Sequence, residues 1–324
     1  METKLVNIPL NNCIMNASGC SCTDSIDLSI LHNSKSGAIV TKSCTLSSRK
    51  GNEEPRYYHN DYMSINSMGL PNLGYHFYEN WIIKNNSNKK PFIFSIAGQS
   101  TGEMQRILEQ IESTFSDEKN ILCEVNVSCP NVKGGTQIGY DFDALNDILR
   151  KIMECKQSNI GIGVKLPPYF EPFHFSHVGD ILINNKISFL TSINSLGNGM
   201  LIDWNKEIPV IKPKGGLGGI GGKACKALGL SNVYQFYREV GDKIDIIGCG
   251  GVENGSDVFE YILAGAKVVQ IGTQLYREKP KQCFDRINDE LELLLKMKGY
   301  NSIEDFHAKL HAKRDAESDL CYSL

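Results

Sequence analysis

The sequence predicts an α/β protein whose fold is a (β/α)8 TIM barrel with long loop excursions over the C-terminal mouth. Three observations point to this fold. Short apolar segments with strand character occur eight times, amphipathic segments lie between several of them, and each strand candidate ends at a glycine or a polar residue. Alternating strands and helices form a parallel sheet, and eight repeats favour a closed barrel over an open sheet.

The eight strand candidates are short, apolar and often β-branched. They cover residues 14–17, 37–41, 92–96, 122–127, 160–166, 189–193, 245–248 and 268–272. The clearest amphipathic helix candidates are residues 101–115, 142–154, 231–240 and 255–264. Two connections, 46–90 and 197–230, exceed ordinary βα loops and should form the excursions. We expect residues 1–312 to form one domain and residues 313–324 a polar tail.

Composition excludes several classes of function. The chain of 324 residues is 41% hydrophobic and 22% charged, with a net charge of −3 and no basic run, which argues against a nucleic-acid partner. No apolar run reaches the roughly 20 residues that span a bilayer, and the N-terminus has no signal-peptide pattern, so we expect a cytoplasmic protein without a membrane partner.

The cysteines and histidines predict no metal site. The 11 cysteines include no C-x-x-C pair, so they are expected to be reduced core residues. His307 and His311 are spaced for one face of a C-terminal helix, and His174 and His177 are also close in sequence. Neither pair has the further ligands of a zinc pattern, so we interpret the first pair as a solvated helix face.

The ends of the strand candidates predict a ligand site, because the carboxyl ends of parallel barrel strands meet at one rim. These ends are Ser18-Gly19, Lys42-Ser43, Ala97-Gly98, Asn126 to Cys129, Lys165, Asn194-Ser195, Gly250-Gly251 and Gly272-Thr273. Any one of them alone is consistent with an ordinary rim residue. Eight together describe a binding site.

The segment from Cys123 to Asn131 indicates catalysis. Its strand ends in a cluster of Asn, Ser, Cys, Pro and Asn, which delivers two carboxamides and the thiol of Cys129 to the rim. A thiol can accept or release a proton near neutral pH when its surroundings adjust its pKa. This pattern suits a catalytic loop.

Four further motifs indicate an anionic ligand. The glycines of the last two strand ends favour a phosphate site, and a phosphorylated cofactor such as FMN fits them better than a dinucleotide. Residues 64–72 suit a turn that presents N–H groups to an anion, and the glycine run 214–223 suits a loop close over a ligand. Lys165 suits a partner for a reduced flavin anion, although a Schiff-base lysine of an aldolase is an alternative.

With these motifs the chain resembles the class 1A dihydroorotate dehydrogenases over about residues 14–310. The matching strings include Thr41-Lys42-Ser43, residues 64–72, 126–132 and 164–170, Asn194-Ser195-x-Gly197-Asn198-Gly199, and both C-terminal glycine motifs. The resemblance implies FMN-dependent oxidation of dihydroorotate to orotate in pyrimidine biosynthesis, with fumarate as the oxidant and a homodimeric enzyme. It also implies that Cys129 is the general base.

The resemblance carries binding roles to individual residues of this chain. The implied substrate residues are Lys42, Asn66, Ser67, Met68, Gly69, Leu70, Asn126, Asn131, Asn194 and Ser195. The implied FMN residues are Ala17, Ser18, Gly19, Lys42, Ser43, Asn126, Lys165, Ile193, Gly221, Gly222, Gly250, Gly251, Gly272 and Thr273.

This chain departs from the family pattern at two places. Residues 133–136 read Lys-Gly-Gly-Thr where the family has Pro-Gly-Lys-Pro, and Glu53 replaces a proline. Two alternatives to the family function are a phosphate-binding barrel aldolase that uses Lys165 and a catalytically inactive barrel that acts as a binding protein. Cys129, Lys42 and Lys165 speak against the inactive barrel.

Overall fold

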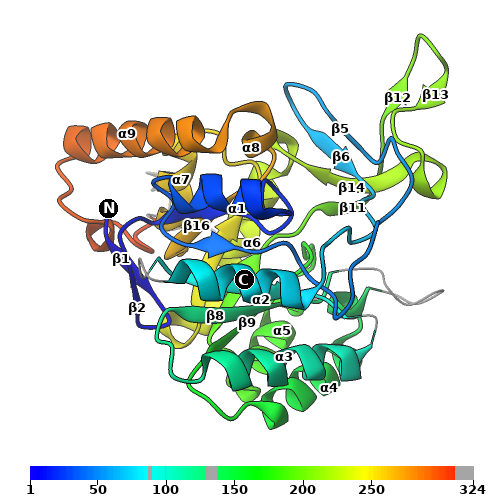
Figure 1. Cartoon of the computed structure of the whole chain (residues 1–324). Coiled ribbons are helices and arrows are strands. Elements are labelled where there is room, and N and C mark those ends of the chain that lie inside the picture. Colours follow the sequence, from blue (N-terminus) through cyan, green and yellow to red (C-terminus); the bar gives the residue numbers. More distant parts are fainter. Residues whose placement is uncertain (87–89, 99, 129–136, 311–324) are drawn as a thin grey trace, which may run out of the picture.

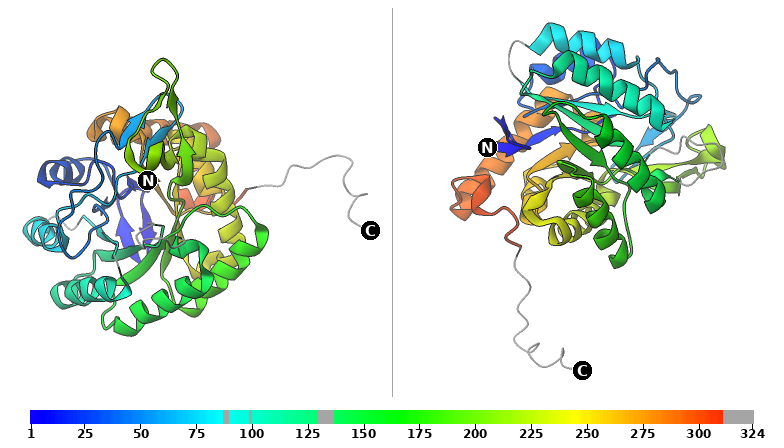
Figure 2. Two further views of the ribbon diagram at one scale, coloured as in Figure 1. Left: turned by 90° about the vertical axis from the view of Figure 1, so that its right-hand side faces the viewer. Right: turned by 90° about the horizontal axis from the view of Figure 1, so that it is seen from below.

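A computed structural model describes residues 1–86, 90–98, 100–128 and 137–310, and the statements below concern these residues. Eight parallel strands form the central sheet, which Figures 1 and 2 show inside a ring of helices. In sheet order they are β3 (Ile14–Asn16), β16 (Val268–Ile271), β15 (Asp245–Cys249), β10 (Phe189–Ser192), β9 (Gly161–Lys165), β8 (Ile121–Asn126), β7 (Phe92–Ile96) and β4 (Ile39–Val40). The predicted (β/α)8 barrel and its eight strands are confirmed.

A side chain completes the seam between the first and last strands of this order. Asn16 on β3 accepts a hydrogen bond from the backbone N–H of Val40 at 3.0 Å and donates to the Val40 carbonyl at 2.7 Å. The Asn16 amide therefore takes the place of a backbone partner between β3 and β4, and the strand ends are held in a closed ring.

The helices cover the outside of the barrel. They are α1 (Ser25–His32), α2 (Tyr75–Asn85), α3 (Thr101–Phe115), α4 (Phe142–Cys155), α5 (Pro172–Asn184), α6 (Lys226–Val240), α7 (Gly255–Leu263), α8 (Gln274–Arg277) and α9 (Pro280–Lys298). Side-chain caps explain why several begin where they do: Ser100, Asp141 and Asn254 accept hydrogen bonds from the first turns of α3, α4 and α7. The four predicted helices are confirmed, although α6 begins five residues before the predicted start.

Side chains fill the barrel at the N-terminal ends of its strands. A short antiparallel hairpin, β1 (Thr3–Leu5) and β2 (Ile8–Leu10), packs Leu5, Ile8 and Leu10 against interior residues that include Phe189 and Ile247. Figure 1 places this hairpin at the end of the barrel away from β12 and β13. The sequence pattern did not predict this hairpin. The hairpin covers this end of the barrel, whereas the large cavity of the described residues lies at the carboxyl ends of the strands.

The two excursions meet in an antiparallel sheet beside the barrel mouth. Its order is β11 (Leu196–Met200), β14 (Leu217–Gly221), β6 (Ser64–Asn66) and β5 (Tyr57–His59). A separate hairpin of β12 (Ile202–Asp203) and β13 (Ile208–Pro209) projects from it, as Figure 1 shows. The prediction of a loop over residues 214–223 is therefore wrong in part, because β14 is a strand that pairs with β6 and β11. Both predicted excursions also extend too far, because they include α2 and the start of α6.

The described residues around His307 do not form the predicted C-terminal helix. Helix α9 ends at Gly299, which adopts a φ of +74°, and only the 3-10 turn Ile303–Asp305 follows within the described residues. The ring Nε2 of His307 lies 3.2 Å from the carbonyl of Gly265. His307 therefore packs against the end of α7 instead of belonging to a solvated helix face. His311 and residues 313–324 lie outside the described part of the chain.

Candidate active site

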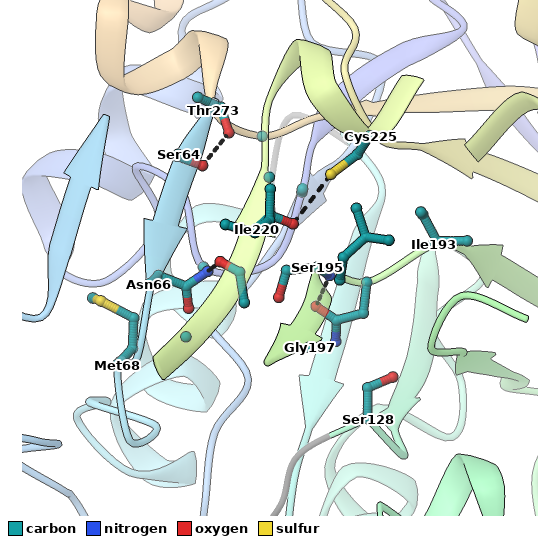
Figure 3. Close-up of a pocket in the computed structure, with 18 of the residues that line it drawn as sticks. Ser64, Asn66, Met68, Ser128, Ile193, Ser195, Gly197, Ile220, Cys225 and Thr273 are labelled. Atoms are coloured by element: carbon teal, nitrogen blue, oxygen red, sulfur yellow. Dashed lines mark hydrogen bonds between the residues drawn. The ribbon is translucent and has the colours of Figure 1, made fainter. Parts of the chain in front are cut away.

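A cavity of about 1470 Å³ opens at the carboxyl ends of the barrel strands. Its walls come from strand ends of the barrel and from the excursion sheet, as Figure 3 shows. Every described residue that the sequence assigned to FMN or substrate lines this cavity. Cys129 and Asn131 lie outside the described residues, so the structure gives no position for either. The described candidates are therefore brought together at one site.

Small residues form one end of the cavity. The hydroxyl groups of Ser64 on β6 and Thr273 after β16 are hydrogen-bonded at 2.8 Å, as drawn in Figure 3. Gly221 lies between them: a Cβ there would approach the two hydroxyl oxygens to 2.8 and 3.2 Å. Gly250 and Gly251, at the end of β15, line the same cavity. Glycines and hydroxyl donors at these two strand ends suit an anionic group such as a phosphate.

A buried cation lies at the end of β9. Lys165 is 4% exposed, and its Nζ donates to Gln270 Oε1 at 2.9 Å and lies 4.0 Å from Cys249 Sγ. Burial alone would lower the pKa of Lys165, but its electrostatic interactions with neighbouring groups, Cys249 and Glu124 among them, act in the opposite direction and raise the pKa. Lys165 is thus an ammonium at neutral pH.

Hydroxyl and amide side chains connect the ends of the strands. Ser18 Oγ donates to the Thr41 carbonyl at 2.8 Å and lies 2.9 Å from Ser43 Oγ. Asn126 on β8 donates to Ser43 Oγ at 3.2 Å and accepts from Asn194 at 3.2 Å. This chain of contacts fixes the orientation of both carboxamides, so their remaining polar atoms have defined directions at the cavity.

Lys42 contributes a second cation to the cavity. Its side chain is 6% exposed, and Nζ donates to the Gly19 carbonyl at 3.3 Å. Within the described residues Nζ makes this one long hydrogen bond to a neutral carbonyl, which leaves its other N–H groups for a ligand.

The excursion sheet forms the wall opposite the barrel strands. Asn66 on β6 donates to the Gly219 carbonyl of β14 at 3.1 Å, and Figure 3 shows this side chain beside the cavity. A Cβ at Gly219 would overlap Ser195 Oγ, so the glycine allows β14 to approach the end of β10 closely. The predicted turn 64–72 begins as a strand, and its later residues Ser67 to Leu70 also line the cavity.

The described thiols at the cavity are poor bases. Burial raises the pKa of Cys20 and of Cys225 to about 12, and it also raises the pKa of Cys249. These groups are therefore protonated thiols near neutral pH.

The sequence reasoning missed several cavity residues. Tyr276 on α8 donates to the Gly19 carbonyl at 2.8 Å, and its ring centroid lies 4.6 Å from that of Tyr57 on β5. Only the pairing of the excursion with the barrel brings these rings together, so no local signal indicates them. Two buried residues that do not line the cavity, Glu124 and Gln270, were also missed, although each is a polar residue inside an apolar strand, which is a signal available in the sequence.

The paired histidines of α5 have different surroundings. His174 lines the cavity and His177 does not, although the rings of both residues pack near Phe142. Within the described ranges, no group of three or more His, Cys, Asp or Glu side chains is placed to hold a metal ion. In the same ranges, no helix is both long enough and apolar enough to cross a membrane.

The chain is similar to known proteins over nearly its whole length. A sequence model of the family described as dihydroorotate dehydrogenase matches residues 1–295. The dihydroorotate dehydrogenase A (fumarate) of Lactococcus lactis subsp. lactis is 46% identical over 96% of this chain and 99% of that protein. The dihydroorotate dehydrogenase (fumarate) of Saccharomyces cerevisiae is 44% identical over 96% and 98%.

A solved structure supports the fold. The DHODH of Eimeria tenella, crystallised with ferulenol, superimposes with a TM-score of 0.77 at 17% identity and covers 95% of this chain and 88% of that one. The family match and the two close relatives decide the relationship: this chain belongs to the dihydroorotate dehydrogenase family.

Proposed function

We propose that this protein is a class 1A dihydroorotate dehydrogenase that uses FMN to oxidise (S)-dihydroorotate to orotate in pyrimidine biosynthesis, with fumarate as the second substrate. One observation carries the proposal: a single cavity is lined by Lys42 and Lys165, by the linked carboxamides of Asn126 and Asn194, and by the glycines that follow β15 and β16. The near full-length similarity to two fumarate-dependent relatives supports the same reaction.

The residues present fit FMN. Gly221 leaves room beside the Ser64 and Thr273 hydroxyl groups where a larger residue would intrude, which suits the phosphate. The Lys165 ammonium at the end of β9 suits the negative charge of a reduced isoalloxazine ring. Bound in this cavity, FMN would supply the acceptor for the substrate hydride and the electrons that reduce fumarate.

The chain's own groups would bind and orient the substrate. Lys42 offers free N–H groups to the carboxylate of dihydroorotate. Asn126 and Asn194, held by each other and by Ser43, offer amide groups in fixed directions to the pyrimidine ring. Asn66 and the following residues close the opposite side. Such fixed donors lower the entropic cost of reaching the reactive geometry.

We assign the proton transfer to Cys129. Oxidation removes a proton from C5 and a hydride from C6 of dihydroorotate, so a base is required beside the hydride acceptor. The protonated thiols of Cys20, Cys225 and Cys249 cannot serve, whereas Cys129 follows Ser128, which lines the cavity. Cys129 takes up the C5 proton as its thiolate becomes a thiol.

The aldolase alternative requires a neutral lysine amine to form a Schiff base. The raised pKa of Lys165 and its hydrogen bond to Gln270 hold this group as an ammonium. We therefore do not favour that chemistry.

We further propose that the protein forms a homodimer through the β12–β13 hairpin. Ile202, Trp204 and Ile208 are 60%, 80% and 51% exposed there, and large apolar side chains grouped on a projecting hairpin suit an interface with a second copy. Sedimentation of the wild type and of Trp204→Ser tests this. A wild-type dimer that the variant shifts toward monomer is expected, and a monomeric wild type would contradict it. The cytoplasmic location stays a prediction.

The proposed activity is tested by identifying the flavin released from the purified protein and by following orotate formation from dihydroorotate. FMN as the released flavin and turnover with fumarate as the sole oxidant are expected. A colourless protein that can neither bind FMN nor form orotate would refute the proposal.

A further inference from the structure

A carboxyl group is buried below the cavity on β8. Glu124 is fully buried, and its Oε2 accepts hydrogen bonds from Thr191 Oγ1 at 2.7 Å and from Gln270 Nε2 at 3.2 Å. Its other oxygen, Oε1, has no hydrogen-bond partner among the residues that the structure describes. An incompletely bonded carboxyl group in the interior is costly, so its presence calls for an electrostatic explanation.

Lys165 provides this electrostatic explanation, because the side chain of Gln270 connects it to Glu124. Gln270 presents its amide oxygen to Lys165 Nζ at 2.9 Å and its amide N–H to Glu124 Oε2 at 3.2 Å. The bridge has one consistent orientation, because the ammonium can only donate and a carboxylate can only accept. The result is a cation–amide–carboxylate chain across β9, β16 and β8.

The other titratable groups around Lys165 do not replace this carboxylate. Cys249 on β15 lies 4.0 Å from Nζ, and Cys20 and Cys22 after β3 also act on it. Burial raises the pKa of Cys20 to about 12 and that of Cys22 to about 11, and also raises the pKa of Cys249, so these groups are neutral thiols. Lys42 lines the same cavity as Lys165 and also acts on Cys20. Glu124 is thus the acidic partner in this set.

We propose that Glu124 is a positioning residue: through Gln270 it keeps Lys165 charged and directed at the cavity before any anion is present there. This inference rests on the proposed function, because it concerns the residue that would face the flavin. A bound anion is then not needed to keep the ammonium protonated. In the wild type, Lys165 carries its proton in both redox states and takes up none when two electrons enter the cavity.

The test is the pH dependence of the flavin reduction equilibrium in the holoenzyme. It is measured by anaerobic titration with dithionite against a reference dye, so no substrate turnover is involved. Glu124→Gln keeps the shape and an acceptor oxygen but removes the charge. In this variant Lys165 is expected to release its proton in the oxidised enzyme and to bind one proton from solvent upon reduction. Relative to the wild type, the equilibrium constant for flavin reduction should then rise by up to a further factor of ten for each unit by which the pH falls. This corresponds to a midpoint potential that rises by about 30 mV more per pH unit for a two-electron couple.

Two variants separate charge from structure. Glu124→Asp keeps the charge and should restore the wild-type pH dependence, and Thr191→Val removes one hydrogen bond without a charge and should leave it unchanged. If Glu124→Gln gives no soluble protein, Gln270→Met cuts the bridge and should give the same steepening.

The outcomes distinguish the two proposals. A wild-type pH dependence in Glu124→Gln, or in Gln270→Met where that variant takes its place, would overturn the inference while leaving the enzyme's function intact. Steepening in Thr191→Val equal to that in Glu124→Gln would also overturn it, because packing would then explain the effect. A wild-type protein that binds no flavin would instead refute the proposed function.

Discussion

Replacing Gly221 by alanine should weaken FMN binding specifically at the phosphate. The new Cβ would lie 2.8 Å from Ser64 Oγ and 3.2 Å from Thr273 Oγ1, both tighter than ordinary contact. Overpacking of this kind costs about 1–3 kcal/mol. Ser64 and Thr273 both line the cavity, so we expect a bound phosphate to restrict the movement of their hydroxyl groups away from the new Cβ, and most of this cost to fall on the bound form. A cost of that size corresponds to a roughly five- to 150-fold higher Kd.

The assay is the quenching of flavin fluorescence when FMN is added to protein stripped of its cofactor. Riboflavin, which lacks the phosphate, provides the matched ligand and should be affected much less than FMN. Gly102→Ala is the matched protein control: Gly102 lies on the exposed side of α3, and a Cβ there would contact nothing within 4 Å. An FMN Kd within twofold of wild type in Gly221→Ala, or an equal loss for riboflavin, would refute the reasoning.

Four further predictions concern the proton transfer, the shared pocket, the barrel core and a partly buried lysine. Cys129→Ala should retain FMN but slow flavin reduction by dihydroorotate at least about a hundredfold in stopped-flow measurements, and Cys129→Ser should gain rate as the pH rises. Asn66→Ala should weaken both half-reactions together, with orotate competing against fumarate in steady-state kinetics; loss in one half-reaction alone would contradict a shared pocket. In Gly163→Ala the Cβ would overlap the ring of Phe189 inside the barrel, so calorimetry should show a lower Tm from a cost of about 1–3 kcal/mol. Burial lowers the pKa of Lys90 from 10.5 to about 8, so its contribution to stability is present above about pH 10.5 and is lost as the pH falls to 8; in Lys90→Met the Tm should lack this pH-dependent component.

The barrel could be predicted from sequence because each of its strands carries a local signal. An apolar β-branched run followed by glycine or polar residues marks both a buried strand and its functional end, so the sequence pattern alone is enough to place Lys165 at the rim. Helix α3 could be placed to the residue because Ser100 caps an amphipathic run.

The excursion sheet could not be predicted in the same way. Strand β14 is glycine-rich and has little strand propensity of its own, and it exists because Gly219 to Gly221 pair with Ser64 to Asn66, more than 150 residues earlier. The Glu124–Gln270 contact spans 146 residues and depends on barrel closure. Local patterns carry no information on such pairings, so the polar residues inside β8 and β16 had no visible partners.

The most direct test of the proposed function is one anaerobic experiment on the purified, flavin-loaded protein. Dihydroorotate is added while the visible absorption of the flavin is recorded, and fumarate, NAD or a quinone is then added separately to the reduced protein. The account predicts that dihydroorotate bleaches the flavin and that fumarate restores the colour faster than NAD or the quinone. A flavin that dihydroorotate does not bleach, or one that NAD or a quinone reoxidises much faster than fumarate does, would contradict it.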